Sequence, residues 1–218
     1  MRLTYALSSY DRSHRVRREY PAQPSRSFVK AFLQLLYVET SSLTANVIDI
    51  DNTSRTITTS ANAGLSITHP GLAAKDDSFA FSGDIGSAGE WPYDIFADEK
   101  GIIVGTSSTA VAVADDNLVA PIANGTSAGQ FVYYGCWGLN YTTGASSASF
   151  DVERIFKNSS GGSITVAEIG IYCTATNQTT PSASQVFGFC ILRDVISPTV
   201  AVGNGEYLKV KYTITVSV

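Results

Sequence analysis

The chain ends in the stretch YLKVKYTITVSV, residues 207–218, in which apolar and polar side chains alternate with a period of two. This period is typical of a β-strand with one buried face. Asn204-Gly205 lies just upstream and suits a tight turn, so we expect residues 199–203 and 206–218 to form a β-hairpin. The final strand is expected to close a sheet and to offer its edge to a neighbouring chain. Its apolar face would hold Leu208, Val210, Tyr212, Ile214, Val216 and Val218.

The strand pattern continues upstream as far as residue 45. Residues 46–60, NVIDIDNTSRTITTS, predict two short strands around a turn at Asp51–Ser54. Many short strands separated by turn residues favour a sandwich or a barrel, and we predict an all-β fold, an antiparallel β-sandwich of jelly-roll-like type. A change of apolar phase in SITVAEIGIY predicts a β-bulge near Ala167-Glu168. The other predicted strands are GIIVG, TAVAVA, GQFVYYGCW, ASFDVERIF, QVFGFCILR and PTVAV.

The N-terminal part of the sequence has a different pattern. Residues 1–24 predict an extended arm that opens with a short strand at RLTYAL. Apolar residues at helical spacing then predict one amphipathic helix over about 25–38, with Ser25 or Ser27 as its cap. We therefore divide the chain into an arm and helix, 1–44, and a β-sandwich domain, 45–218. That domain contains a long loop-rich insertion around 60–100.

The predicted helix is apolar around more of its girth than one sheet covers. We expect the surplus surface to lie in a subunit interface, which predicts that deleting residues 1–38 leaves a folded domain that no longer assembles. The arginines of the arm are either a solvated segment or a contact with an acidic partner. The candidate interface residues are Phe28, Val29, Phe32, Leu33, Leu36, Arg15, Arg17 and Arg18.

Composition limits the classes of partner. Only 16% of residues are charged against 44% hydrophobic, and the net charge is −4. Low charge suits contact with other protein surfaces, and the lack of a basic stripe argues against nucleic acid. No apolar run reaches the roughly 20 residues that cross a bilayer, so we expect no membrane insertion. The start of the chain has no apolar core of signal-peptide length, which predicts synthesis and folding in a cytoplasm.

The residues that carry chemistry are few. His14 lies in the arm and His69 precedes Pro70 in a loop, so neither offers a rigidly held base. Asp49 and Asp51 resemble the start of a calcium loop, but the glycine and the distal glutamate are missing. We expect no catalytic residue, no cofactor and no metal. The cysteines, Cys136, Cys173 and Cys190, are expected to be buried free thiols, with a Cys173–Cys190 disulfide as the alternative.

Three segments, 101–133, 149–172 and 191–216, resemble a pattern found in virion structural proteins of tailed bacteriophages. A Val-Gly-Thr segment precedes Pro-Ile-x-x-Gly, and an Arg-x-Phe-x-Asn-x-Ser-Gly turn leads into Ile-Thr-Val-x-Glu-Ile-Gly-Ile-Tyr. An Arg-Asp-Val segment and a terminal hairpin follow. The resemblance implies a structural subunit in the virion, in a tail, baseplate, fibre or head-associated position. It also implies a homo-oligomer that contacts tail, portal-proximal or capsid proteins.

Two other functions remain open. Trp91 and Trp137 either pack in the core or form a stacking platform for sugars, as in a carbohydrate- or receptor-binding module. An enzyme such as a polysaccharide depolymerase is the third hypothesis, although no convergent acid/base set stands out.

Overall fold

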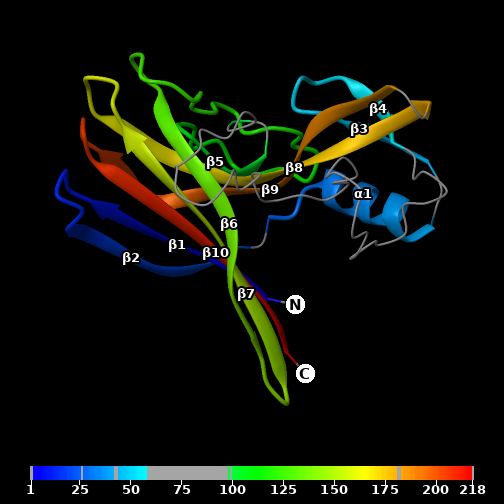
Figure 1. The fold of residues 1–218 in the computed structure, drawn as a ribbon, viewed down its shortest axis with the longest axis horizontal. Helices are drawn as coiled ribbons and strands as arrows, with labels where there is room; N and C mark the ends of the chain where they lie inside the picture. Colours follow the sequence, from blue (N-terminus) through cyan, green and yellow to red (C-terminus); the bar gives the residue numbers. More distant parts are fainter. Residues whose placement is uncertain are drawn as a thin grey trace.

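The computed structural model describes residues 2–25, 27–41, 44–57, 98, 100–180 and 183–217. This part of the chain contains one helix and ten strands (Figure 1). In chain order they are β1 Arg2–Tyr10, β2 Val16–Ser25, α1 Lys30–Ser41, β3 Ala45–Ile48, β4 Ser54–Ile57, β5 Gly101–Gly105, β6 Phe131–Thr143, β7 Ser147–Asn158, β8 Ile164–Thr180, β9 Ala183–Val202 and β10 Tyr207–Ser217.

The strands form three antiparallel sheets. Sheet A has the order β2-β1-β10-β7-β6, sheet B the order β5-β8-β9, and sheet C is the β3–β4 hairpin. The prediction of an all-β fold with antiparallel sheets is confirmed, and so are the two short strands expected within 46–60, which are the paired strands β3 and β4. The bulge near Glu168 is also confirmed, because the pairing of β8 with β9 shifts register between Val166 and Glu168.

The terminal strand β10 is a central strand. It pairs with β1 on one side and with β7 on the other, almost from end to end. A tight turn does occur where expected, with Gly205 at φ 83° and Glu206 N–H donating to Gly203 O at 3.0 Å. However, the turn carries the chain from β9 in sheet B to β10 in sheet A. The hairpin prediction is therefore wrong in its pairing, since a local turn signal does not tell which strands become neighbours.

The central position of β10 also overturns the expectation that its edge meets a neighbouring chain, because both edges are already occupied. Its alternation is confirmed at Leu208, Val210 and Tyr212, which are fully buried. Towards the C-terminus the same face emerges from the core, and Val216 is exposed. One end of β10 thus belongs to the core and the other to a projection from it.

Residues 2–25 are not an extended arm. β1 buries Leu3, Tyr5 and Leu7 in the core and pairs with β10, for example Tyr5 with Tyr212. β2 continues the sheet as its outermost strand on that side. The strand pattern at RLTYAL runs on to Tyr10, which is why the segment joins the sheet. The strands of residues 2–25 therefore share a sheet with the C-terminal strand.

The helix begins at Lys30, five residues later than predicted. Residues 27–29 instead follow the edge of β9, where Val29 N–H donates to Ile191 O and Arg193 N–H donates to Ser27 O, both at 3.1 Å. Residues 27–29 therefore bond to β9 with backbone groups that they would need if the helix began at residue 25. Val29 is buried, Phe28 and Phe32 are half-buried, and Leu33 is 66% exposed.

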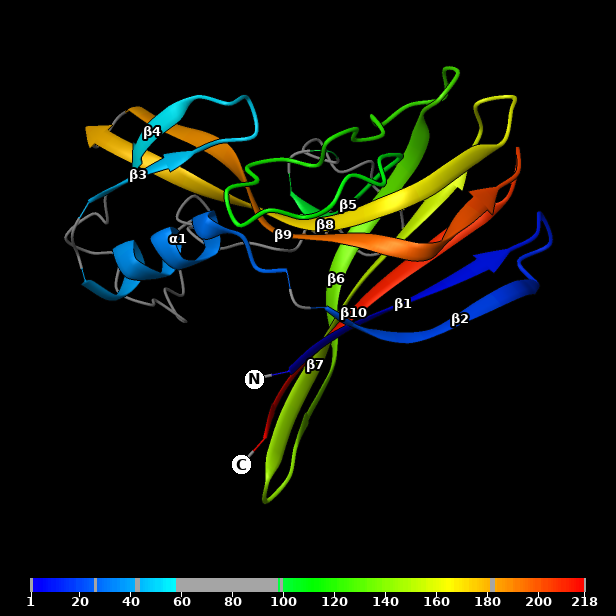
Figure 2. The same ribbon diagram turned by 180° about the vertical axis from the view of Figure 1, so that it is seen from behind.

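Sheets A and B lie over one another with a single core between them (Figures 1 and 2). The core includes Tyr212 and Phe156 from sheet A and Ile169 and Leu192 from sheet B. The fully buried Arg154 on β7 links the two sheets. Its Nη1 donates to Lys100 O, just before β5, at 2.8 Å and to Ile102 O, within β5, at 3.1 Å.

One predicted strand differs from the structure, and one predicted region is not described by it. TAVAVA, residues 109–114, is not a strand and lies within a loop, 106–120, that packs on sheet B. The predicted insertion around 60–100 falls almost wholly outside the described residues. Among the described residues, no helix is long and apolar enough to cross a membrane.

Candidate functional site

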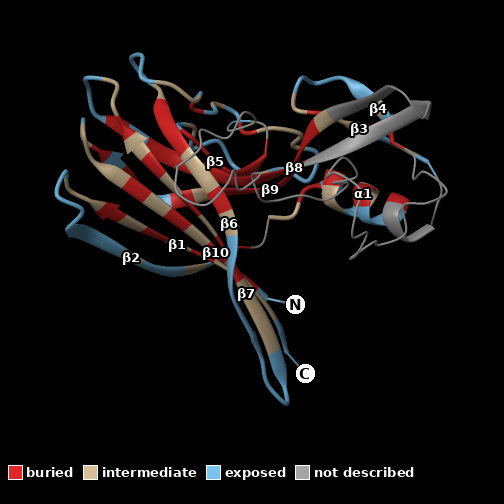
Figure 3. Ribbon diagram, in the orientation of Figure 1, coloured by how far each residue is buried: buried red, intermediate tan, exposed pale blue. Residues whose placement is uncertain are grey.

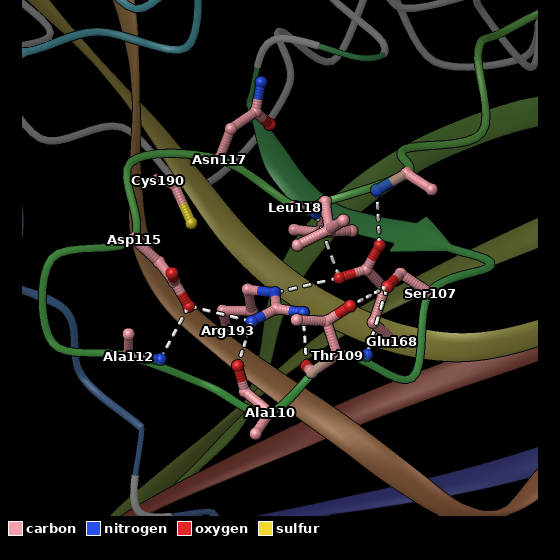
Figure 4. Close-up of polar contacts among 12 residues, drawn as sticks. Ser107, Thr109, Ala110, Ala112, Asp115, Asn117, Leu118, Glu168, Cys190 and Arg193 are labelled. Carbon is pink, nitrogen blue, oxygen red and sulfur yellow. Dashed lines mark hydrogen bonds and ion pairs between the residues drawn. The ribbon is translucent and has the colours of Figure 1, made fainter.

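Two features stand out as candidates for function: a buried polar network on sheet B and a hairpin that projects from sheet A. The network centres on Arg193 of β9 (Figure 4). Its Nε donates to Glu168 Oε2 at 2.8 Å, and its Nη1 donates to Asp115 Oδ2 at 2.8 Å. The side chains of Arg193 and Glu168 are wholly buried, whereas that of Asp115 is partly exposed. A buried arginine thus faces two carboxylates.

The network fastens the loop 106–120 to sheet B. Arg193 Nη2 donates to Thr109 O at 2.8 Å, and Asp115 Oδ2 accepts from Ala112 N–H at 2.9 Å. Glu168 accepts from Ala120 N–H at 2.7 Å through Oε1 and from Val119 N–H at 3.2 Å through Oε2. Both ends of the loop are therefore bonded to two side chains of adjacent strands.

Tyr172 on β8 holds the C-terminal part of the same loop. Its hydroxyl accepts from Leu118 N–H at 2.9 Å and donates to Asn117 Oδ1. Asn117 Nδ2 in turn donates to Ile50 O at 2.8 Å, which joins the loop to the chain that leaves β3. Burial raises the pKa of Tyr172 well above its ordinary value, so the hydroxyl stays protonated and able to donate.

Two glycines allow this close packing. A Cβ on Gly105 would lie 2.6 Å from Glu168 Oε1 and 2.7 Å from Ala120 O. A Cβ on Gly170 would lie 2.6 Å from both Leu118 Cδ1 and Leu192 O. Any larger residue at either position would push the loop away from the sheet.

The side chains of the network bind mainly backbone groups of the loop 106–120 and hold this loop in place. Both oxygens of Glu168 accept from loop amides, Oε2 also accepts from Arg193, and the side chain is not accessible to a substrate. Within the described ranges, no group of three His, Cys, Asp or Glu side chains is placed to hold a metal ion. The network therefore anchors the loop 106–120 to sheet B. Anchoring of this kind keeps the outer surface of the loop in a fixed position.

The second feature is the end of the β6–β7 hairpin, which projects from the molecule beside both termini (Figures 1 and 2). We name residues 138–150, GLNYTTGASSASF, the neutral hairpin, because they contain no charged residue and no proline. All residues of β6 from Gly138 to Thr143 are exposed (Figure 3). Tyr141 is 74% exposed and Leu139 is 40% exposed.

The neutral hairpin is ordered by polar contacts on one face. Asn140, at φ 55°, donates from Nδ2 to Asp151 Oδ2 at 2.9 Å, and Thr142 Oγ1 lies 2.9 Å from Ser149 Oγ. Asp151 Oδ1 also accepts from Thr213 Oγ1 at 2.6 Å. Burial raises the pKa of Asp151, but the hydrogen bonds from Thr213 and Asn140 and the nearby Lys211 outweigh it and lower the pKa overall.

The predicted interface residues do not form one surface. The helix residues lie beside sheet B, whereas Arg15, Arg17 and Arg18 lie at the β1–β2 turn and on β2. Arg17 forms an ion pair with Glu206, and Arg18 lies over the ring of Tyr20 at 5.0 Å. These contacts join arginines to the protein itself, which favours the interpretation as a solvated segment.

The predicted stacking residues are only partly described. Trp137 is half-buried on β6, opposite Glu153 in the register with β7. Trp91 lies outside the described residues. The prediction of buried free thiols is confirmed at Cys136, Cys173 and Cys190, and no disulfide joins the last two.

Sequence reasoning missed the network of Arg193, Glu168 and Asp115. One signal was present: Glu168 is the single charge in VAEIG, and Arg193 lies beside Asp194 in the otherwise apolar segment ILRDV. A charge in such a segment needs a partner of opposite sign when it is buried.

The chain matches no family model, no curated protein and no solved structure.

Proposed function

We propose that the protein is a non-enzymatic structural subunit of a tailed-phage virion and that it works as a homo-oligomer. The observation that carries this proposal is the neutral hairpin, which extends beyond the core with Gly138–Thr143 exposed throughout. A two-stranded extension of this kind gains little stability in water by itself. It is useful to a protein whose task is to contact other subunits.

The resemblance to virion structural proteins supports the same class. Its three segments supply β5, β7, β8, β9 and β10, together with the loop that Arg193 and Glu168 fasten. The resemblance thus lies mainly in strands that contribute to the shared core. A rigid core that carries a projecting element is suited to assembly, in which surfaces must be presented in fixed positions.

The proposal includes a finer interpretation of the fold. We infer that sheets A and B are the two layers of a β-sandwich, because they enclose one core. The jelly-roll connectivity is not established by the strand order, since the hairpins β1–β2, β6–β7 and β8–β9 each stay inside one sheet.

We propose that the subunit is located in the virion and contacts other virion proteins of the tail, the portal region or the capsid. The exposed helix residues Leu33 and Leu36 belong to the proposed contact surfaces together with the neutral hairpin. Gold-labelled antibody against this chain, viewed by electron microscopy on purified particles, tests the location. Labelling at one repeated position supports the proposal, and particles without label contradict it.

Carbohydrate or receptor binding is the second candidate function. Trp137 favours this function. The half-buried residue lies on a face of sheet A that also carries two ion pairs, Lys209–Glu153 and Lys211–Asp151. An aromatic ring beside charged groups is a common arrangement for stacking a sugar and binding its hydroxyls. A glycan array with the intact protein and with Trp137→Ala tests it. Binding that is lost in the variant supports this function, and no binding by either protein removes it.

A further inference from the structure

The two outer edges of sheet A are built differently. The β2 edge carries charges and prolines, including Arg17, Arg18, Pro21 and Pro24. Charges and prolines on an edge strand prevent another strand from pairing with it, and proline has no N–H to donate. The opposite edge is β6, whose final residues 138–143 lie in the neutral hairpin and contain no charge and no proline. A bulge is the irregularity of this edge, since the pairing with β7 shifts register between Leu139 and Thr142 and Asn140 has φ 55°.

The upper part of the β6 edge is covered by the protein itself. Gly125 N–H donates to Phe131 O at 2.8 Å, and Tyr133 N–H donates to Asn124 Oδ1 at 3.1 Å. Over 138–143 the sheet order assigns β6 no second neighbour among the described residues. The protein therefore covers the start of this edge, at Phe131 and Tyr133, and leaves its final residues, 138–143, uncharged and exposed.

We propose that residues 138–143 pair with the same residues of a second copy, antiparallel across a two-fold axis. Such pairing would join two five-stranded sheets through adjacent β6 strands. This inference rests on the proposed function, in which the protein acts through contacts between subunits. It adds which surface makes one of those contacts.

Charge selects a second copy as the occupant. The whole chain has a net charge of −4, which gives two copies a net repulsion, but the neutral hairpin brings no charge of its own to the contact. Pairing of β2 with β2 would place Arg17 and Arg18 against their own copies. Pairing of β6 with β2 would place the prolines of β2 in the new strand pair. It would also be a head-to-tail contact that repeats without closing, whereas the two-fold β6 contact closes as a dimer.

Lysine substitution tests the edge. Leu139→Lys together with Tyr141→Lys adds charges at exposed positions of the neutral hairpin. The matched control, Val16→Lys together with Ala22→Lys, adds the same charge at exposed positions of the β2 edge. Light scattering on the eluting full-length proteins should give twice the chain mass for the native protein and for the control. The β6 variant should give the mass of one chain, with an unchanged circular dichroism spectrum.

Cysteine substitution tests the register. In a two-fold antiparallel pair one residue faces its own copy, with Cα atoms about 4.5–5.5 Å apart, which is within disulfide range. Single variants Leu139→Cys, Tyr141→Cys, Thr142→Cys and Thr143→Cys are oxidised, with Val16→Cys as the control. The three native thiols are buried, so the new thiol is the one that reacts. Cross-linked dimer should peak at one position or at an adjacent pair and be absent in the control.

Three outcomes overturn the inference. One is an oligomer whose mass and cross-linking are the same for the β6 variant and the control, which leaves the proposed function intact. The second is a native protein that is monomeric in solution although gold label finds it in particles, which points to a strand from another virion protein. The third is equal cross-linking at Val16→Cys. A β6 dimer that is absent from particles would instead contradict the proposed function and support this inference.

Discussion

Arg193 Nε on β9 lies 2.8 Å from Glu168 Oε2 on β8, and neither side chain is exposed to solvent. The pair spans a position where the register of the two strands shifts, between Val166 and Glu168. The bulge turns Glu168 so that its carboxylate meets both the arginine and the amides of the loop 106–120. The stability of sheet B is therefore coupled to the position of this loop.

The first prediction concerns this pair. Arg193→Met should destabilise the protein by about 3–5 kcal/mol, because the buried Glu168 and the partly exposed Asp115 lose their counterion. Urea unfolding followed by circular dichroism measures the loss. Arg17→Met is the control, since Arg17 is 59% exposed and its pair with Glu206 is worth about 0–1 kcal/mol. Equal, small losses for both variants would show that the buried pair does not support the fold.

The second prediction concerns Tyr172. Tyr172→Phe removes the hydroxyl that accepts from Leu118 N–H, which leaves a buried donor unpaired and should cost about 1–3 kcal/mol. Hydrogen exchange of the loop 106–120 should become faster while the core strands stay protected. Tyr141→Phe, at an exposed ring, should change stability by less than about 0.5 kcal/mol. Unchanged exchange in the Tyr172 variant would mean that the hydroxyl does not hold the loop.

The third prediction is a pH dependence at the neutral hairpin. The pKa of Asp151 is lowered in the folded protein, so its contribution to stability is present above the ordinary Asp pKa of about 3.9 and is lost as the pH falls through the lower, folded value. Stability measured between pH 6 and pH 2 should show this acid loss in the native protein. In Asp151→Asn the same step should be absent. If both proteins lose stability in parallel, other carboxylates account for the acid dependence.

The fourth prediction concerns the thiols. Burial raises the pKa values of Cys173 and Cys190 above the ordinary range, and Cys136 is buried as well. A thiol reagent at pH 8 should therefore find no fast-reacting cysteine in the folded protein and three after denaturation. One fast thiol in the folded protein would show that part of the core opens to solvent.

The fifth prediction replaces the expectation that the chain without residues 1–38 still folds. Removal of residues 1–25 alone takes away β1 and β2, including Leu3, Tyr5 and Leu7, each worth about 1.5–3 kcal/mol of buried surface. It also uncovers the long edge of β10. The truncated protein should lack the amide dispersion of a folded domain in NMR. A truncated chain with native dispersion would restore the earlier division into arm and domain.

The sequence predicted those parts of the fold that depend on local alternation. Leu208, Val210 and Tyr212 were assigned to a buried face, and the phase change at Glu168 gave the bulge. It did not predict strand neighbours, because the turn at Gly203–Glu206 has the same local residues whether it closes a hairpin or links two layers. Residues 2–10 were expected to be part of an arm and not a strand of the sheet for the same reason, since the partner of β1, β10, lies at the other end of the chain.

The candidate site was harder to predict than the fold. TAVAVA alternates like a strand, but the carbonyls of Thr109 and Ala110 bind Arg193 instead of a neighbouring strand. That competition depends on a residue more than 80 positions away. The helix start moved for a related reason, because Ser27 and Val29 bond to β9. Only the tertiary fold reveals such contacts.

The most direct test of the proposed function is the copy number of this chain in purified particles, if a phage genome encodes it as the proposal requires. Quantitative mass spectrometry with isotope-labelled peptides of the chain, after a high-salt wash, gives that number. The proposal predicts many copies per particle, in a fixed ratio to other structural proteins. A chain that is abundant in the infected lysate but absent from washed particles would contradict it.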